Sequence, residues 1–349
     1  MRPDALSDLL PTLLPTHAPF GTPVPLPGGL LNHVWRVPTT RGPVVVKHAP
    51  PHIASQPEVP LDPSRLTFEA RALALFAPEA PLAALATPSL RPPRRLAFDA
   101  ARHVLVMEDV QPTGALGEAL DEPAATPARW GAALGRFLGA LHRTTQGDEA
   151  LRERFWNEPV QDTRYNVQYI AITDILTRCG IPAAATLGAS ARALGRRLRT
   201  PGGCLVMGDA WLPSFLVTRG GALRCIDWEF CTFGHPLQDV AHLEAHLWMH
   251  AHRGRAADAV NALRTAFRAA YVETLCDARA ALWTPADYAA AGVHFGAELL
   301  VRAAGPFQAG FLYDGCDLLH PAVQSAVDRA VRALRAPVDP AIAWLSARR

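Results

Sequence analysis

Apolar positions follow two periods along the chain and predict a strand-rich first third followed by helices. In the first third, short apolar runs bounded by Gly and Pro predict strands. Beyond residue 110, apolar residues recur mainly at 3/4 spacing. The strands are expected at 30–37, 43–48, 94–100 and 103–110. The helices are expected at 4–14, 66–76, 129–144, 190–199, 239–252, 256–275, 285–304 and 321–336.

The break in pattern after Val110 predicts a domain boundary. Gln111-Pro-Thr-Gly interrupts the periodicity there. We therefore expect an α+β protein with a β-rich domain at 1–110 and a mostly helical domain at 111–349. The proline-rich stretch 50–64 is expected to be a loop between a strand and the helix 66–76.

One hairpin is predicted inside the helical part. Strands at 215–217 and 223–226 flank a turn at 219–221 that contains two glycines. Asp209 precedes the first strand and Asp227 ends the second, so a hairpin can bring both carboxylates to one mouth. The alternative is that Asp209 is a turn residue and Asp227 a cap.

Composition excludes several classes of protein. A net charge of +2 with 19% charged residues gives no reason to expect a nucleic acid or an anionic membrane as partner. The N-terminus lacks the unbroken apolar core of a secretory signal, and no uncharged run approaches the roughly 20 residues of a membrane span. Six cysteines without a C-x-x-C pair suggest no disulfide framework. We expect a reduced, cytoplasmic protein.

A single lysine is the sharpest feature of the composition. Lys47 is the only lysine among 34 basic residues, and it lies at the end of the strand 43–48. Arginine cannot replace lysine where a compact ammonium must enter a crowded site. The alternative is an accident of drift. Gly28-Gly29 before the first strand can let backbone N–H groups approach a phosphate, although such a pair is more often a plain turn.

Three further patterns allow both a structural and a functional interpretation. Gly131, Gly135 and Gly139 share one row of a helix and predict close packing against a neighbour. Histidines 242, 246 and 250 have the i, i+4, i+8 spacing of a metal site but lack an H-E-x-x-H motif. Aromatic and polar clusters between 155 and 169 suit either a pocket rim or core packing.

The order of these features resembles the aminoglycoside phosphotransferase and choline kinase family. The shared order is a glycine-led hairpin, a strand lysine, a helix glutamate (Glu69), a Met-Glu-Asp strand end, and two acids around a late hairpin. Methylthioribose kinases are a close cousin within it. The resemblance implies the two-lobed protein-kinase-like fold, with a small antiparallel-sheet N-lobe, one key helix and a larger helical C-lobe.

The resemblance implies a nucleotide site in the first lobe. Lys47 resembles the lysine that holds the α- and β-phosphates, and Glu69 the glutamate that pairs with it. The other implied nucleotide-binding positions are Gly28, Gly29 and Asn32 in the phosphate-covering hairpin, Met107 behind the adenine slot, and the backbone of Glu108 and Val110 along the adenine edge.

The resemblance also implies a catalytic loop and a metal site. Asp209 resembles the catalytic aspartate, and Asp227, Ser214 and Glu229 resemble ligands of Mg²⁺. The Asp of Gly234-His-Pro-Leu-Gln-Asp239 is usually structural. Met207 replaces the family's usual His, which removes a hydrogen-bonding support of the loop, and Ser214 replaces its usual Asn.

The implied activity is Mg²⁺-dependent transfer of the γ-phosphate of ATP or GTP to a hydroxyl of a small metabolite. Met207 and Ser214 keep a second hypothesis open, a nucleotide-binding pseudokinase with a regulatory or partner-binding role. The acceptor stays open between an aminoglycoside, an amino alcohol such as choline, and a sugar, as do the choice of nucleotide and the oligomeric state. Candidate choline-binding aromatic residues are Trp211, Trp228, Trp248 and Trp283.

Overall fold

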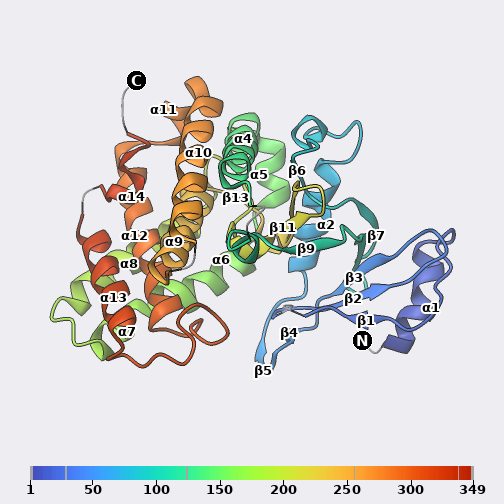
Figure 1. Cartoon of the computed structure of the whole chain (residues 1–349), viewed down its shortest axis with the longest axis horizontal. Helices are drawn as coiled ribbons and strands as arrows, with labels where there is room; N and C mark the ends of the chain where they lie inside the picture. Colours follow the sequence, from blue (N-terminus) through green and yellow to red (C-terminus); the bar gives the residue numbers. More distant parts are fainter. Residues whose placement is uncertain (1–2, 28–29, 123–124, 255, 337, 347–349) are drawn as a thin grey trace. The chain divides into compact units, whose positions relative to one another are not determined.

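The protein forms two compact units. Our computed structural model describes residues 3–27, 30–122, 125–254, 256–336 and 338–346 (Figure 1). The N-terminal unit comprises Met1–Thr113 and Thr218–Cys231, and the C-terminal unit comprises Gly114–Val217 and Thr232–Arg349. The segment 218–231, which contains most of the late hairpin, therefore belongs to the N-terminal unit although more than a hundred residues separate it from the rest of that unit. The predicted division into domains 1–110 and 111–349 stays a prediction.

A five-stranded antiparallel sheet forms the centre of the N-terminal unit. Its order is β1-β2-β3-β8-β7, and four of its strands were predicted from the sequence. Side chains alternate between the two faces along β3, so that Val44 and Val46 are buried on one face while Val45 and Lys47 point to the other. The strands are β1 (Val24–Pro25), β2 (His33–Val37), β3 (Val44–His48), β7 (Arg95–Asp99) and β8 (Val104–Glu108).

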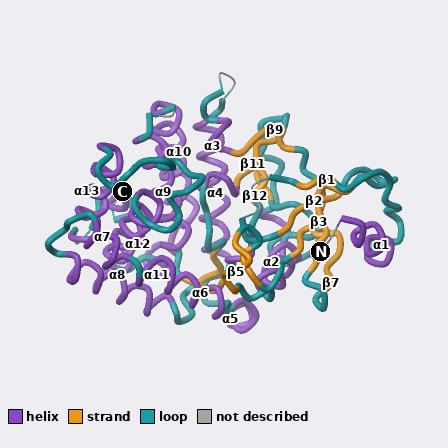
Figure 2. Tube along the Cα trace, turned by 90° about the horizontal axis from the view of Figure 1, so that it is seen from below, coloured by secondary structure: helices purple, strands orange, loops and turns teal. Residues whose placement is uncertain are grey.

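One helix packs on each face of this sheet. Helix α1 (Pro3–Leu13) packs Leu6 and Leu10 against Trp35 and the valines of the central strands. Helix α2 (Arg65–Leu75) serves the opposite face, where Glu69 reaches Lys47. Both helices lie beside the sheet strands in Figure 2. Lys47 thus lies on the face of the sheet that α2 covers, whereas the face that α1 covers is packed with apolar side chains.

The prediction of a plain loop at 50–64 was wrong. The segment contains β4 (His52–Ile53) and β5 (Gln56–Pro60), which form a separate two-stranded ribbon. All five residues of β5 are exposed, and proline is tolerated on an exposed edge strand because the missing N–H would face solvent. The prolines that suggested a loop are therefore compatible with this ribbon.

A short strand was also missed between 88 and 95. Strand β6 (Leu90–Arg91) pairs in parallel with β12 (Leu223–Cys225), more than a hundred residues away. Nothing local to the sequence marks such pairing. Before β12, Gly221 donates to the Thr218 carbonyl oxygen at 2.8 Å and Thr218 donates to the Ala222 carbonyl oxygen at 2.9 Å, so the predicted turn of the late hairpin is confirmed.

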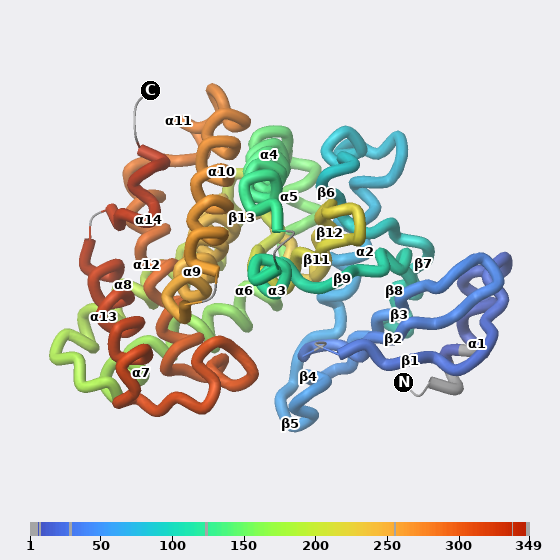
Figure 3. The backbone as a smooth tube through the Cα atoms, viewed as in Figure 1, coloured from blue at the N-terminus to red at the C-terminus, as the bar shows by residue number. Residues whose placement is uncertain are grey.

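The C-terminal unit is mostly helical, as Figure 3 shows along the green-to-red part of the chain. The two-stranded antiparallel pair of β10 (Cys204–Val206) and β13 (Thr232–Gly234) brackets the catalytic-loop region in sequence. A π-helical turn, Tyr165–Ile170, interrupts the helices. The main helices are α4 (Pro127–Thr144), α5 (Glu149–Phe155), α6 (Glu158–Arg164), α7 (Ile172–Arg178), α8 (Ala184–Leu198), α9 (Leu237–His252), α10 (Ala257–Leu275), α12 (Pro285–Ala303) and α13 (Pro321–Arg335).

Shorter elements complete the described chain. The short helices are α3 (Leu116–Ala119), α11 (Arg279–Leu282) and α14 (Pro340–Ala343), and the remaining strands are β9 (Pro112–Ala115) and β11 (Phe215–Thr218). No helix within the described residues is long and apolar enough to cross a membrane. All six cysteines are free thiols, consistent with the absence of a disulfide pattern in the sequence.

The glycine row of α4 makes the close helix contact predicted from the sequence. A Cβ built on Gly131 would lie 2.0 Å from the Leu263 carbonyl oxygen, and one on Gly135 would lie 2.3 Å from the Phe267 carbonyl oxygen. Both oxygens belong to the backbone of α10. A backbone atom cannot move aside as the end of a flexible side chain can, so these positions admit only glycine at this helix separation.

We expect Gly131→Ala to destabilise the protein by about 1–3 kcal/mol, the usual cost of inserting a methyl group into a packed contact. Alanine gains about 1 kcal/mol of helix propensity over glycine, which offsets only part of that cost. Urea unfolding measures the change. Gly220→Ala, where a Cβ meets no atom within 4 Å, is the control, and equal stability of the two variants would contradict the contact.

Candidate active site

The only lysine of the chain lies buried among three carboxylates in the N-terminal unit. Its Nζ is 2.7 Å from Glu69 Oε2, 2.8 Å from Asp227 Oδ1 and 3.3 Å from Glu229 Oε1. The sequence predicted the pairing with Glu69 through the family resemblance. Asp227 and Glu229 reach the same ammonium because the segment after β12 folds back beside α2 within this unit.

The charges of this cluster do not balance. Burial alone would lower the pKa of Lys47, but the three surrounding carboxylates raise that pKa well above its ordinary value. Burial, together with the neighbouring carboxylates, raises the pKa of Glu69 to about 7 even though Lys47 opposes this. Even with the Arg65 guanidinium, which pairs with Glu229, three carboxylates face two cations, so the cluster can accommodate further positive charge.

Asp227 is the accessible member of the cluster. Its side chain is 38% exposed, whereas those of Lys47 and Glu69 are 4% and 1% exposed. One carboxylate oxygen contacts Lys47, and the other has no partner within the described residues. The backbone of Asp227 is in the left-handed region at φ 62°, a conformation that Asp tolerates better than most residues and that is often found at functional sites.

Glu229 is held by a second set of donors. The Asn32 side-chain amide donates to both carboxylate oxygens of Glu229, at 2.8 and 2.9 Å. Arg65 Nε donates to Oε2 at 3.1 Å, and Arg65 also donates to Asn32 Oδ1 at 3.0 Å. Asn32 and Glu229, both predicted site residues, are therefore tied to each other and to a buried arginine.

The predicted adenine-edge positions lie at the end of β8. Met107 is buried, and the Glu108 amide donates to the Arg94 carbonyl oxygen at 3.0 Å. Burial raises the pKa of the Glu108 carboxyl, but its ion pairs with Arg91 and Arg94 outweigh burial and hold that pKa below its ordinary value. Val110 follows the strand and is half-buried. Gly28 and Gly29 lie outside the described residues.

The C-terminal unit holds the candidate catalytic aspartate. Asp209 Oδ1 lies 3.2 Å from Arg164 Nη2 and 3.2 Å from His242 Nε2, and the side chain is 17% exposed. Burial raises the pKa of Asp209, but His242 and Arg164 outweigh it and lower that pKa below the ordinary value. Asp209 Oδ2 has no partner among the residues described, so one oxygen is anchored and the other is available.

A buried acid supports the loop that carries Asp209. Asp239 accepts hydrogen bonds from the Met207 amide at 2.9 Å and the Gly208 amide at 2.7 Å. His142 Nε2 lies 3.0 Å from the same carboxylate. Met207 is itself fully buried in the core. The loop is therefore held through its backbone N–H groups.

Two of the predicted Mg²⁺ ligands have an oxygen atom available to a hard cation. Ser214 Oγ in the C-terminal unit is buried and has no hydrogen-bond partner within the described part, which is unusual for a buried hydroxyl. Asp227 in the N-terminal unit has an accessible carboxylate oxygen. Carboxylate and hydroxyl oxygens fit Mg²⁺. Glu229 fits less well, because both its oxygens already accept hydrogen bonds from Asn32 and Arg65.

Sequence reasoning missed three residues that the structure brings to these sites. Arg65 and Arg164 are indistinguishable in sequence among 33 arginines, and their partners are remote in the chain. His242 was considered only as a metal ligand. One signal could have placed His242 near Asp209. His242 follows Asp239 by three residues on the same helix, and Asp239 binds the loop that carries Asp209.

Comparison with known proteins decides the family. A model described as the phosphotransferase enzyme family matches residues 22–286. This chain belongs to the phosphotransferase enzyme family. The match includes parts of both units and contains Lys47, Asp209 and Asp227. The family resemblance expected from the sequence, and the prediction of a phosphotransferase enzyme, are confirmed.

Individual relatives are distant but span most of the chain. The chain is 25% identical over 306 residues to a 4-hydroxytryptamine kinase of Psilocybe cyanescens, covering 79% of each protein. A choline kinase from Streptococcus pneumoniae has a similar structure, with TM-score 0.53 and 14% identity over 95% of this chain and 98% of that one. A spectinomycin phosphotransferase solved with ADP and spectinomycin gives TM-score 0.50 and 10% identity over 97% and 98%. These likenesses confirm the predicted α+β, protein-kinase-like fold.

Proposed function

We propose that this phosphotransferase is a kinase that moves the γ-phosphoryl group of a nucleoside triphosphate, ATP or GTP, to a hydroxyl of a small metabolite. The observation that carries the proposal is the burial of the only lysine among Glu69, Asp227 and Glu229. An ammonium held in place by a helix carboxylate is suited to bind phosphate oxygens. The ADP bound to the spectinomycin phosphotransferase supports a nucleotide as the donor.

The residues of the N-terminal unit would bind the nucleotide. Lys47, positioned by Glu69, would contact the phosphates, and Met107 with the backbone of Glu108 and Val110 would line the base. Gly28 and Gly29 remain candidates for backbone contacts with phosphate. Asn32 and Glu229 would hold the site together through their mutual hydrogen bonds. Asp227 would supply an oxygen ligand to Mg²⁺, as would Glu229 after exchange of its present partners. Ser214, in the C-terminal unit, is the third proposed oxygen ligand.

Mg²⁺, when bound, would neutralise charge on the phosphates. Asp209 would accept a hydrogen bond from the acceptor hydroxyl at Oδ2 and take its proton as the new O–P bond forms and the bond to the leaving diphosphate breaks. Its lowered pKa keeps Asp209 ionised and ready to accept that hydrogen bond near neutral pH. The anchoring of Oδ1 fixes the direction in which Oδ2 points.

The acceptor is a small hydroxylated molecule in this proposal, and the relatives suggest its range. Their names include a hydroxytryptamine, choline and spectinomycin. Two of the four tryptophans considered for a choline cage, Trp228 and Trp283, are core residues. The face of Trp211 is already covered by the Arg302 guanidinium, 4.6 Å from the ring centroid. A choline cage at Trp211 would have to displace that arginine.

A transfer assay tests the proposal. The purified protein is incubated with Mg·ATP or Mg·GTP and hydroxyindoles, amino alcohols, sugars and aminoglycosides, and phosphorylated product is detected by mass spectrometry. We expect transfer to at least one class, slowed about 10²–10⁴-fold in Asp209→Asn. Nucleotide binding without transfer to any acceptor would favour the pseudokinase alternative. A cytoplasmic location and the absence of nucleic-acid and membrane partners stay predictions from composition.

A further inference from the structure

A buried histidine lies directly against the candidate catalytic aspartate. His242 on α9 is 2% exposed, and its Nε2 lies 3.2 Å from Asp209 Oδ1. The ring N–H is not well aligned with that oxygen, and Nε2 has no hydrogen-bond partner elsewhere in the described chain. In ligand-free active sites, hydrogen bonds of this kind are often long or poorly aligned. His242 and Arg164 thus both contact the same oxygen of Asp209, Oδ1.

Two buried neighbours of His242 favour a proton at its Nε2. Tyr169 lies 2.6 Å from His294 Nδ1, its one polar partner among described residues, and burial raises the pKa of Tyr169, so the hydroxyl keeps its proton and donates it. Burial lowers the pKa of His294 well below its ordinary value, so that ring is neutral. Its single N–H must then be at Nε2, 3.4 Å from His242 Nδ1.

The donors therefore run in one direction. Tyr169 donates to His294, His294 faces His242 Nδ1 with its N–H, and His242 is left with its own N–H at Nε2, toward Asp209. A neutral His242 keeps its one N–H away from the N–H of His294, and a protonated His242 carries an N–H at both nitrogens, so Nε2 bears a proton in either state. A donor at that position favours the ionised form of Asp209.

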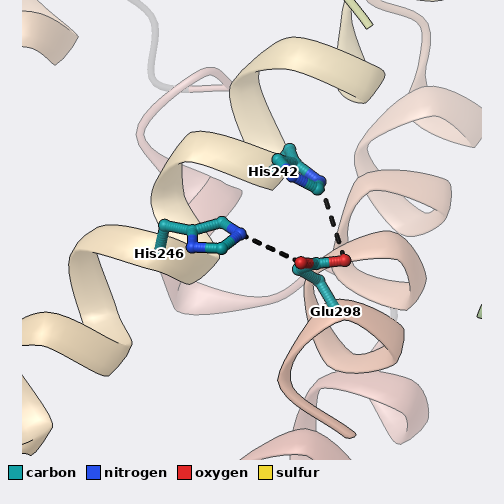
Figure 4. A group of neighbouring side chains, drawn as sticks. All are labelled: His242, His246 and Glu298. Carbon is teal, nitrogen blue, oxygen red and sulfur yellow. Dashed lines mark hydrogen bonds and ion pairs between the residues drawn. The ribbon is translucent and has the colours of Figure 1, made fainter. Parts of the chain in front are cut away.

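A buried carboxylate lies on the other side of His242 (Figure 4). Glu298 Oε2 is 3.7 Å from His242 Nδ1 and accepts from Gln168 at 2.8 Å. Glu298 Oε1 accepts from His246 at 2.9 Å and from Arg302 at 2.8 Å. Burial raises the pKa of Glu298, but His242, Arg302 and His246 outweigh burial and hold that pKa well below its ordinary value.

The same three side chains could in principle hold a metal. Potential ligand atoms of His242, His246 and Glu298 lie within 4.8 Å of one another, and all three are buried. However, both oxygens of Glu298 already accept hydrogen bonds, and one of them is paired with the Arg302 cation. A metal would have to displace that cation. The described contacts therefore favour a hydrogen-bonded network, and metal content becomes an outcome of the test.

An irregular turn of the backbone supplies part of this network. The π-helical turn Tyr165–Ile170 carries Gln168 and Tyr169, and Arg164 immediately precedes it. These three residues contact Glu298, His294 and Asp209. π-turns are rare and occur frequently at functional sites. The turn and the residue before it thus supply one direct contact to Asp209, from Arg164, and two contacts to the groups around His242, from Gln168 and Tyr169.

We propose that His242 is a positioning residue for the phosphoryl-transfer reaction, whose Nε2–H, directed by Tyr169 and His294, holds Oδ1 of Asp209 so that Oδ2 faces the acceptor hydroxyl. The inference rests on the proposed function. His242 does not touch the reacting atoms. It acts together with Arg164, and its removal leaves one of the two anchors in place.

The test compares His242→Leu, which lacks an N–H, with His242→Gln, whose amide places an N–H at similar reach. Other groups facing Asp209 are Arg164 before the π-turn and, on α12, Arg302, His294 and Glu298; none is altered. We expect the acid limb of the kcat/KM profile to move up by about one pH unit in His242→Leu. Losing a donor to the ionised carboxylate raises its pKa. In His242→Gln, whose amide keeps an N–H near Asp209, the profile should stay close to that of wild type.

A second readout needs no turnover. Asp209 is followed by ¹³C NMR of labelled aspartate, assigned through Asp209→Asn, and its titration should shift upward in His242→Leu by the same amount. His252→Leu on the same helix is the control, because His252 contacts Tyr313 and Ser325 instead of Asp209. If His242→Leu fails to fold, Tyr169→Phe should give a smaller shift in the same direction.

The outcomes separate this inference from the proposed function. An unchanged Asp209 titration and kcat/KM profile in His242→Leu and Tyr169→Phe would overturn the inference while the enzyme remains a kinase. Stoichiometric metal in the wild-type protein that is lost in His242→Leu would also overturn it. A shifted titration in a protein whose Asp209→Asn variant transfers phosphate as well as wild type would overturn the proposed function instead.

Discussion

Asp209→Asn is expected to lower kcat by about 10²–10⁴-fold, the usual cost of removing a positioned base. The amide keeps the size of the side chain, but it cannot take a proton and presents an N–H where the acceptor hydroxyl needs an oxygen. The loop itself should persist, because Asp239 and not Asp209 accepts its backbone N–H groups. Steady-state kinetics on the acceptor identified by the transfer assay measure the effect.

Two controls separate catalysis from folding in this variant. The melting temperature of Asp209→Asn should be close to that of wild type, since Oδ1 can still accept from Arg164 and His242. Asp239→Asn should instead lower both stability and kcat, because it disturbs a fully buried acceptor of two amides. A kcat within threefold of wild type for Asp209→Asn would exclude Asp209 as the base.

Lys47→Met should destabilise the protein and abolish transfer. Removing one partner of a buried ion pair typically costs about 3–5 kcal/mol, because the remaining charge stays buried and uncompensated. Here Glu69 and Glu229 are both buried around the vacated position. Chemical unfolding measures the loss. The double variant Lys47→Met, Glu69→Gln should recover part of the stability, since one uncompensated carboxylate is gone, and none of the activity.

Lys47→Arg tests whether this position requires lysine, the only one in the chain. The variant keeps the charge, but a planar guanidinium is bulkier than an ammonium and cannot occupy the same buried space between Glu69 and Asp227. We expect stability between that of Lys47→Met and wild type, and kcat/KM reduced by about 10²–10³-fold. Wild-type activity in Lys47→Arg would mean that the single lysine reflects drift.

The N-terminal site could be predicted well because its key residues are locally marked. Lys47 stands out by composition, Glu69 lies on the next helix, and Asp227 ends a recognisable hairpin. The resemblance then supplied their order. Glu229 was expected to bind metal, and its bonds to Asn32 and Arg65 were not foreseen. Those bonds join the residue before β2, helix α2 and the segment after β12, which no periodicity in the sequence brings together.

The surroundings of Asp209 could not be predicted, for the same physical reason. His242, His294 and Glu298 belong to helices whose amphipathic patterns explain their burial but not which side chains meet. The π-turn that presents Tyr169 has no known marker in the sequence. The ribbon β4–β5 was missed because proline in an exposed edge strand looks the same as proline in a loop.

The central claim is that Asp227 holds the metal of the nucleotide while Asp209 serves the acceptor, so the two variants should separate in a binding measurement. Calorimetric titration with nucleotide, with and without Mg²⁺, tests this without any acceptor. We expect Mg²⁺ to strengthen binding to wild type and to Asp209→Asn equally. Asp227→Asn should weaken Mg·nucleotide binding by about 10- to 100-fold, the loss of a charged contact. Equal affinity and equal Mg²⁺ dependence in wild type and Asp227→Asn would contradict the account.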